Sequence, residues 1–386
     1  MFSSFIQSAP HRNRGLTPWG RLLAVAATLL LGAPSSASAA VITTVARQPA
    51  ALCAAPIDAW LISTRQLGCT HGNFPAPGPA LRYWQRVDNS GPWQPRTHAD
   101  FIATSQDTRE TWIMIHGNRV NSQEAVNYGS QVARSLVPGH KSGLPLRTIT
   151  WSWPSDQIHG LAQDVRTKAA RTPSESFYLG WLVNQMPAPT PAVFIGHSFG
   201  ARIGTGTMHL LAGGALHGYG LAGYNAERHL SRGIFTASAI HNNWLLPGAA
   251  HGRALDQAES ILFINNSCDP ALKRYRFIDR NRPEAIGYCG ATVDAARRHK
   301  VKQLDACGSV GKTHDANLFM RAGSLIGNMR MFLPMNWGQP LPIPLSTKTP
   351  SPFRQLADQL VIGTAGAVVT KDSYAEQTVS FLAGDE

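Results

Sequence analysis

The sequence predicts an α/β fold, a doubly wound and mostly parallel sheet with helices on both faces. Short apolar runs of strand length alternate along the chain with longer segments that have room for helices. The runs at 112–115 and 192–195 are apolar throughout, which is typical of strands that are buried on both faces. A glycine-flanked serine, Ser198, separates the second run from a helical pattern, as a tight strand-to-helix turn requires.

Eight segments are predicted to be strands because each is apolar and is bounded by Gly, Pro or polar residues. They are residues 59–63, 81–87, 111–115, 146–151, 192–195, 233–239, 260–264 and 300–304. The longer segments between them predict helices. These are residues 122–136, 156–186, 201–211 and 291–299.

The N-terminus has the features of an export signal. A basic stretch ends at Arg21, an apolar run follows at 22–31, and Ala-Ser-Ala at 37–39 offers small residues for cleavage. The run is shorter than the roughly 20 residues that a spanning helix needs. We therefore expect residues 1–39 to be removed as a signal peptide, with an uncleaved anchor as the alternative.

Basic residues outnumber acidic ones, with 35 Lys and Arg against 23 Asp and Glu and a net charge of +12. The charge is spread along the chain, without a long Lys/Arg run or a basic stripe interleaved with aromatic residues. The usual footprint of a nucleic-acid-binding protein is therefore missing. The surplus favours at most peripheral contact with an anionic envelope surface or an acidic substrate.

All five cysteines lie beyond the predicted signal, and in an oxidising compartment some of them are expected to pair. Cys53 with Cys69 closes a short local loop and is the first candidate pair. Among the other three, Cys289 with Cys307 is the favoured pair, which leaves Cys268 single. The alternative is that buried cysteines act as small apolar residues.

The most informative motif is Gly-His-Ser-Phe-Gly at 196–200. A sharp turn from strand to helix forces its middle residue into a strained conformation, and the flanking glycines remove the clashes. Such a turn projects the Ser198 hydroxyl above the edge of the sheet. Phe199 begins the helix, so its backbone N–H faces the same point and can stabilise an oxyanion. The alternative is an ordinary Gly/Ser turn.

A serine hydroxyl is a weak nucleophile near neutral pH and needs a base, which in turn needs an orienting acid. Asp269 follows the predicted strand 260–264, at the edge of the sheet where ligands bind in open α/β proteins. His314 lies on the loop after the last predicted strand and is the candidate base. Asp305 also follows a strand and is the competing acid. The alternatives are an Asp-Pro turn at 269 and a surface histidine at 314.

A second donor to the oxyanion is expected in the turn after an earlier strand. His116, Gly117 and Asn118 directly follow the predicted strand 111–115. We select the backbone N–H of Asn118, with that of Gly117 as the alternate. His116 is expected to orient or pack against its neighbours rather than to act as a second base.

Other patterns in the chain are less specific. The run 306–313 matches a relaxed phosphate-loop pattern, but Ala306 stands where the first glycine belongs, and a magnesium-binding aspartate does not follow. His-Glu-x-x-His does not occur, and neither does a Cys/His spacing suited to zinc. The aromatic and apolar residues at 151–154 and 244–246 either border a substrate cleft or belong to the core.

Together these segments resemble an α/β-hydrolase, in particular the exported bacterial members of unknown substrate. The resemblance covers about residues 55–335 and rests on segments 116–118, 151–156, 196–202, 265–270 and 310–314. The serine turn and the His-Gly turn are specific to the superfamily, whereas the Asp and His assignments depend on their order in the chain. The resemblance implies a serine-hydrolase fold and a catalytic triad of Ser198, Asp269 and His314, but no particular substrate.

On this basis we expect an exported serine hydrolase of the esterase or lipase type, located in the periplasm, the medium or the cell envelope. Its expected substrate is a small-molecule or lipid ester, or a thioester, cleaved through an acyl-enzyme without a cofactor or a metal. Residues 40–335 are expected to form the catalytic domain, with a loop-rich start, and residues 336–386 a Pro-rich extension. The alternatives are a non-catalytic envelope-binding module on the same fold and an acyltransferase with the same triad.

Overall fold

The computed structural model describes residues 57–68, 79–87, 91–105, 110–142, 144–186, 190–223, 231–278 and 281–333. The predicted signal peptide (1–39), the predicted Cys53–Cys69 pair and the C-terminal extension (336–386) lie outside these residues. Within the described ranges, every helix is too short or too polar to cross a bilayer.

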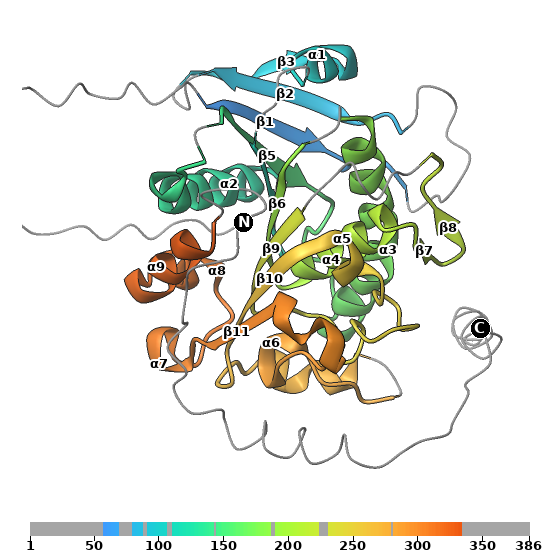
Figure 1. Cartoon of the computed structure of the whole chain (residues 1–386), viewed down its shortest axis with the longest axis vertical. Coiled ribbons are helices and arrows are strands. Elements are labelled where there is room, and N and C mark those ends of the chain that lie inside the picture. Colours follow the sequence, from blue (N-terminus) through green and yellow to red (C-terminus); the bar gives the residue numbers. More distant parts are fainter. Residues whose placement is uncertain are drawn as a thin grey trace, which may run out of the picture. The chain divides into compact units, whose positions relative to one another are not determined.

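A nine-stranded sheet runs through the described part of the chain, in the order β11-β10-β9-β6-β4-β5-β1-β2-β3 (Figure 1). All neighbours from β11 to β1 are parallel, whereas β2 is antiparallel to both β1 and β3. The predicted doubly wound, mostly parallel sheet is therefore confirmed. Its strands are β1 (Asp58–Ser63), β2 (Arg82–Val87), β3 (Gln94–Arg96), β4 (Glu110–Ile115), β5 (Leu146–Ser152), β6 (Ala192–His197), β9 (Ser231–Thr236), β10 (Ala258–Asn265) and β11 (Val301–Asp305).

Helices cover both faces of the sheet. Figure 1 shows α2 (Ser122–Leu136) and α9 (Gly323–Phe332) on one side, and α3 (Leu161–Gln185) with α4 (Phe199–Leu211) on the other. The shorter elements are α1 (His98–Ala103), α5 (Ala254–Gln257), α6 (Ile286–Cys289), α7 (Cys307–Val310), α8 (Ala316–Phe319), three 3-10 helices (Val137–Gly139, Leu272–Phe277 and Ala295–Lys300) and the hairpin β7 (Ala215–Leu216) with β8 (Tyr219–Gly220).

Some predicted boundaries are wrong for local reasons. Helix α3 begins five residues later than predicted, after Gly160, whose φ of 82° is not helical. Strand β9 ends at Thr236 instead of 239, because Ala237 has a φ of 44°, outside the strand region. The predicted helix 291–299 is only a 3-10 turn that starts after Asp294, whose side chain accepts a hydrogen bond from the Arg297 N–H.

The central strands are buried along their whole length. Every residue of β4, β5, β6 and β9 is buried, which is why the runs 112–115 and 192–195 carry no polar alternation. Helix α2 begins at Ser122, as predicted, because both hydrogen bonds of a capping box are present. Asn121 accepts a hydrogen bond from the Glu124 N–H (3.0 Å), and the Glu124 carboxylate accepts one from the Asn121 N–H (2.8 Å).

The order of the strands brings the turns after β4 and β6 together. β4 pairs with β5 on one side and with β6 on the other. The connection after β4 therefore leads to β5 on one side, and the connection after β5 crosses to β6 on the opposite side of β4. At such a switch point the two connections diverge, and a crevice opens outside the carboxyl ends of the strands. Gly117 follows β4 and Ser198 follows β6, so both lie at this edge of the sheet.

The disulfide joins Cys268 to Cys307, so the predicted Cys289–Cys307 pair is wrong. Cys268 lies just after β10 and Cys307 just after β11. These parallel strands pair through Asn265 and Asp305 at their carboxyl ends, and this pairing brings the two thiols together. Cys289 is instead in α6, where its thiol is free, and burial raises the pKa of that thiol to about 12.

Replacing both disulfide cysteines, as Cys268→Ala with Cys307→Ala, is expected to lower the free energy of unfolding by about 2–4 kcal/mol, because the cross-link restricts the unfolded chain. Urea denaturation under non-reducing conditions measures the loss. The control is Cys289→Ala, which leaves the cross-link intact and is expected to lose less. Equal losses in the two proteins would contradict the assignment.

Candidate active site

Ser198 is held in a strained conformation at the end of β6. Its φ of 55° and ψ of −118° lie outside the regions that L-residues favour, and Phe199 directly after it is the first residue of α4. The Ser198 backbone is fixed to the end of β9 and to the segment after it, since the Ser198 N–H donates to Thr236 O (3.0 Å) and the Ala239 N–H donates to Ser198 O (3.2 Å). Strain of this kind costs about 1–3 kcal/mol, and these contacts maintain it.

The two glycines of the turn have no room for a side chain. A Cβ on Gly196 would lie 2.6 Å from the backbone of Gly200, and a Cβ on Gly200 would overlap the carbonyl group of Ile115. Helix α4 therefore passes directly over the ends of β4 and β6. This close approach is what places the Ser198 side chain at the edge of the sheet.

The structure brings Ser198, His314 and Asp269 into one hydrogen-bonded chain. The Ser198 hydroxyl lies 2.9 Å from His314 Nε2, and His314 Nδ1 lies 2.5 Å from an Asp269 carboxylate oxygen. A carboxylate accepts the Nδ1 proton, which leaves Nε2 free to accept the proton of the hydroxyl. Asp269 is fully buried, whereas the His314 side chain is 29% exposed.

Asp269, rather than Asp305, faces the histidine. Its second carboxylate oxygen accepts hydrogen bonds from the backbone N–H groups of Ala271 (2.8 Å) and Leu272 (3.1 Å), which fix the direction of the first. The Asp305 carboxylate instead accepts hydrogen bonds from the N–H and hydroxyl groups of Ser267. Asp305 thus joins the turn after β10 to the end of β11.

The predicted oxyanion turn lies against the serine. A Cβ on Gly117 would be 3.2 Å from Ser198 Cβ, so Gly117 lies directly beside the serine side chain. Phe199 is at the first position of α4, where a backbone N–H has no acceptor within the helix. The roles of Phe199 and Asn118 as donors to an oxyanion stay predictions.

His116 stabilises this turn through buried hydrogen bonds and ring stacking. It is fully buried, its Nδ1 donates to Gly117 O (2.9 Å), and its Nε2 accepts from the Trp153 N–H (3.3 Å). The two rings stack, with their centroids 5.6 Å apart, and the Trp153 indole donates to His116 O (2.9 Å). Burial lowers the pKa of His116 to about 3, so the ring is neutral at ordinary pH and packs as an uncharged group.

Two acidic side chains also hold this turn, and neither was predicted from the sequence to have that role. Asp164, in the first turn of α3, is fully buried and accepts hydrogen bonds from the side chains of Asn118 (3.0 Å), Arg119 (2.9 Å) and Lys168 (3.3 Å). Burial alone raises the pKa of Asp164, but hydrogen bonds, that from Arg119 first, bring the pKa below its ordinary value. Asp164 therefore stays charged and ties the oxyanion turn to α3.

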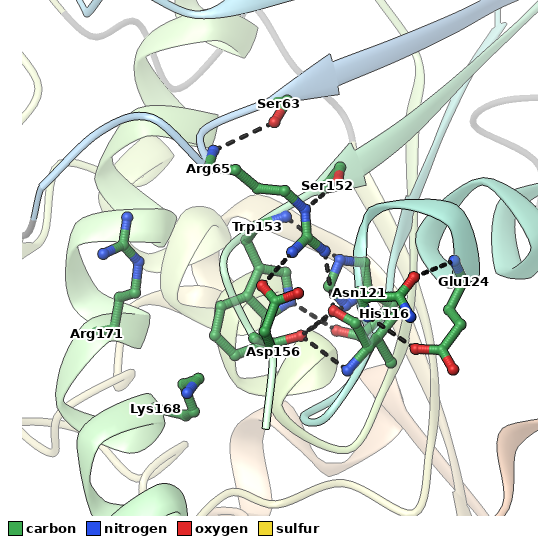
Figure 2. Close-up of polar contacts among 12 residues, drawn as sticks. Ser63, Arg65, His116, Asn121, Glu124, Ser152, Trp153, Asp156, Lys168 and Arg171 are labelled. Atoms are coloured by element: carbon green, nitrogen blue, oxygen red, sulfur yellow. Dashed lines mark hydrogen bonds and ion pairs between the residues drawn. The ribbon is translucent and has the colours of Figure 1, made fainter. Parts of the chain in front are cut away.

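The second acid, Asp156, acts through an arginine (Figure 2). Arg65 pairs with Asp156 at 2.5 Å, donates to the Ser152 hydroxyl at 2.8 Å, and donates to Val120 O at 2.9 Å. The guanidinium thus joins the end of β5 to the chain segment that leads from the oxyanion turn into α2. Asp156 itself is 59% exposed.

The aromatic segments divide between core and surface. Trp151, Trp153 and Leu245 are fully buried and belong to the core. Trp244 is partly buried, and the guanidinium of Arg202, one turn along α4 from Ser198, lies 4.3 Å from its ring centroid.

The described residues contain no group of three or more His, Cys, Asp or Glu side chains placed to hold a metal ion.

The strand order and the geometry of the site identify the fold. Ser198 follows β6, Asp269 follows β10 and His314 follows β11, on a sheet whose order is 11-10-9-6-4-5-1-2-3. This is the α/β-hydrolase fold. In that fold a nucleophile, an acid and a histidine follow one another along the chain, and Ser198, Asp269 and His314 lie in that order.

Comparisons with known proteins give only distant likeness. Neither a protein-family model nor a curated protein matches the chain. A carboxyl esterase 2 from the mycorrhizal fungus Tuber melanosporum is 10% identical, with a TM-score of 0.33 over 70% of this chain and 88% of that one. An inhibited esterase B from Lactobacillus rhamnosis is 13% identical, with a TM-score of 0.31 over 67% and 82%. The assignment of the hydrolase fold rests on this chain's own strands and turn.

Gly200→Ala is expected to lower the free energy of unfolding by about 1–3 kcal/mol, because the added methyl group meets backbone that cannot move without disturbing β4. Chemical denaturation measures the change. Gly327→Ala in α9 is the matched control, since nothing lies within 4 Å of its added Cβ. Alanine in a helix interior is favoured by about 0.5–1 kcal/mol, so this control is expected to be stabilised. The account fails if the two variants have the same stability.

Asp164→Asn is expected to lower the free energy of unfolding by about 3–5 kcal/mol near neutral pH, because it leaves Arg119 and Lys168 beside a buried neutral group. The folded-state pKa of Asp164 lies below the unfolded value of about 3.9. Its stabilising contribution is therefore complete above that value and is lost as the pH falls through the folded-state pKa.

Urea denaturation of wild type and Asp164→Asn between neutral and strongly acidic pH checks both points. The difference between the two proteins should be constant above about pH 5 and should shrink below about pH 4. Asp156→Asn is the control, because the Asp156 side chain is 59% exposed and its ion pair with Arg65 is expected to contribute less than about 1 kcal/mol. A difference that grows in acid would refute the assignment.

Proposed function

We propose that this protein is an exported serine hydrolase that cleaves a carboxylic ester, or a related lipid or thioester bond, through an acyl-enzyme. One observation carries the proposal. A serine in a strained strand-to-helix turn shares a hydrogen bond with a histidine, and the histidine shares one with a buried aspartate. The hydrolase fold alone does not carry it, because one fold hosts many functions.

In this mechanism His314 acts first as a base. Nε2 takes the proton of the Ser198 hydroxyl as the oxygen attacks the carbonyl carbon, and the resulting imidazolium later gives that proton to the leaving alcohol. Asp269 keeps the Nδ1 proton in place and stabilises the imidazolium. The two backbone hydrogen bonds to the other oxygen of Asp269 hold the carboxylate in the orientation that this requires.

The tetrahedral intermediate places a negative charge on the former carbonyl oxygen. The backbone N–H groups of Phe199 and Asn118 are the proposed donors to this oxygen. Removing one such donor costs roughly 3–4 kcal/mol of transition-state stabilisation in other serine hydrolases. Water, activated by the same histidine, then releases the acid from the acyl-enzyme.

The strain at Ser198 favours an enzyme over a binding module that merely retains the fold. A φ of 55° at a serine costs about 1–3 kcal/mol, and two glycines without room for a side chain are needed to maintain it. Binding to an envelope surface requires none of this. Strain that persists at a nucleophile supports a catalytic role.

The Cys268–Cys307 disulfide supports export, because disulfides persist in oxidising compartments. The predicted signal at residues 1–39 points the same way. The destination is the periplasm, the medium or the cell envelope, where the chain's surplus of basic residues allows peripheral contact with anionic lipid. The substrate is a small-molecule or lipid ester, and no nucleic acid is involved.

Ser198→Ala is expected to abolish ester hydrolysis, with a loss of about 10⁵- to 10⁶-fold in kcat, and Asp269→Asn is expected to lose about 10⁴-fold. A panel of chromogenic esters of increasing acyl-chain length measures the rates. Ser309→Ala, which removes an exposed serine on α7, is the matched control and should keep full activity.

A fluorophosphonate probe provides a test that does not depend on the substrate. It should label folded wild type at Ser198 and leave Ser198→Ala unlabelled, and absence of labelling on folded wild type would refute the proposal. Product analysis with and without an added alcohol separates hydrolysis from transfer. Free acid should predominate, whereas predominant transfer to the alcohol would replace the hydrolase by an acyltransferase with the same triad.

A further inference from the structure

The position of His314 is set by contacts with its backbone. The residue lies between α7 and α8, outside any helix or strand. Its side chain must nevertheless keep Nε2 within 2.9 Å of the Ser198 hydroxyl. Two buried side chains that the mechanism does not use, Asn266 and His197, form hydrogen bonds with the main chain of this loop. Asn266 lies in the turn that carries Asp269, and His197 directly precedes Ser198.

Asn266 joins the histidine loop to the turn that carries the acid. It is fully buried, and its amide nitrogen donates to Gly311 O (2.9 Å) and to Thr313 O (2.8 Å). An amide has two N–H groups, so both are used on this loop. The main-chain carbonyl oxygen of Asn266 accepts from the Asp269 N–H (3.0 Å), and its side-chain oxygen accepts from the Cys268 N–H (3.1 Å). One residue therefore sets the separation between the acid and the loop of the base.

His197 joins the same loop to the serine turn. Its Nε2 donates to the carbonyl oxygen of His314 (3.0 Å), and its Nδ1 accepts from the Thr236 hydroxyl (2.9 Å). Its ring centroid lies 5.0 Å from that of His314 and 5.7 Å from that of Phe319. Burial, followed by the proximity of His314, lowers the pKa of His197 to about 3, so the ring is neutral and its single N–H is used in this hydrogen bond.

We propose that Asn266 and His197 are the positioning residues of His314, which hold its main chain at fixed distances from Asp269 and Ser198. The inference rests on the proposed function. Asn266 is three residues before the acid, and His197 is the residue directly before the nucleophile. Asn266 therefore fixes the loop of the base relative to the acid, and His197 fixes it relative to the nucleophile. Neither side chain contacts the substrate carbonyl in the mechanism above.

Other contacts keep the surrounding fold in place if either side chain is changed. The acid turn is also linked to α7 by the Cys268–Cys307 disulfide, and to β11 by the hydrogen bond of the Ser267 hydroxyl to Asp305 (2.6 Å). Loss of the Asn266 amide should thus release mainly residues 311–314. A displacement of about 1 Å of a reacting group can cost on the order of 100-fold in rate.

The test compares ester hydrolysis by Asn266→Ala and His197→Phe with that by wild type. We expect kcat to fall roughly 10- to 100-fold while KM stays nearly constant, because alignment rather than substrate binding is lost. His197→Gln places an amide N–H near the position of Nε2 and is expected to restore most of the activity. Asn265→Ala is the matched control, since that neighbouring amide contacts Gln303, and it should leave kcat unchanged.

Thermal unfolding and the rate of labelling by the fluorophosphonate probe are measured on each protein. Should Asn266→Ala fail to fold, the comparison of His197→Phe with His197→Gln decides. Folded variants with wild-type kcat would overturn the inference, as would a glutamine variant that folds as well as the phenylalanine variant and is no more active. If wild type itself neither hydrolyses esters nor reacts with the probe, the proposed function fails first and the inference fails with it.

Discussion

The site depends on the backbone conformation of Ser198. A residue with a φ of 55° at the end of β6 is held there by hydrogen bonds to Thr236, at the end of β9, and to Ala239, just after it. Helix α4 must then cross the ends of β4 and β6 so closely that only glycine fits at 196 and 200. The single hydroxyl that results is placed where three separate connections of the sheet converge, and the acid and base of the proposed triad arrive on two of them.

The support around this point is unequal on its two sides. On the acid and base side, a disulfide, the amide of Asn266 and the imidazole of His197 join the turns through short-range, uncharged contacts. On the side of the proposed oxyanion donor Asn118, the turn is held by charges, with Asp164 and the Arg65–Asp156 pair as the anchors. Charged anchors respond to pH and salt, whereas a cross-link and neutral hydrogen bonds do not. These two sets of contacts should therefore differ in their response to pH and salt.

Much of this arrangement is local enough to be predicted from the sequence. The strand-to-helix turn at Ser198 is specified by five consecutive residues, and Asp269 and His314 follow from the order of the strands. What the sequence leaves open depends on how distant strands meet. The Cys268–Cys307 pairing follows from the register of β10 with β11, which spacing along the chain does not reveal. Asp164 and Asn266 carry no motif, and their roles are visible only in the structure, where three side chains donate to one carboxylate and one amide donates to two carbonyl groups.

The most direct measurement is a crystal structure of the full chain after reaction with a small phosphonate ester. The account predicts a covalent bond from phosphorus to Ser198 Oγ, a phosphoryl oxygen within hydrogen-bonding distance of the Phe199 and Asn118 backbone N–H groups, and His314 between Asp269 and the leaving-group position. An adduct on another residue, or an imidazole at 314 out of contact with both the adduct and Asp269, would contradict the central claim.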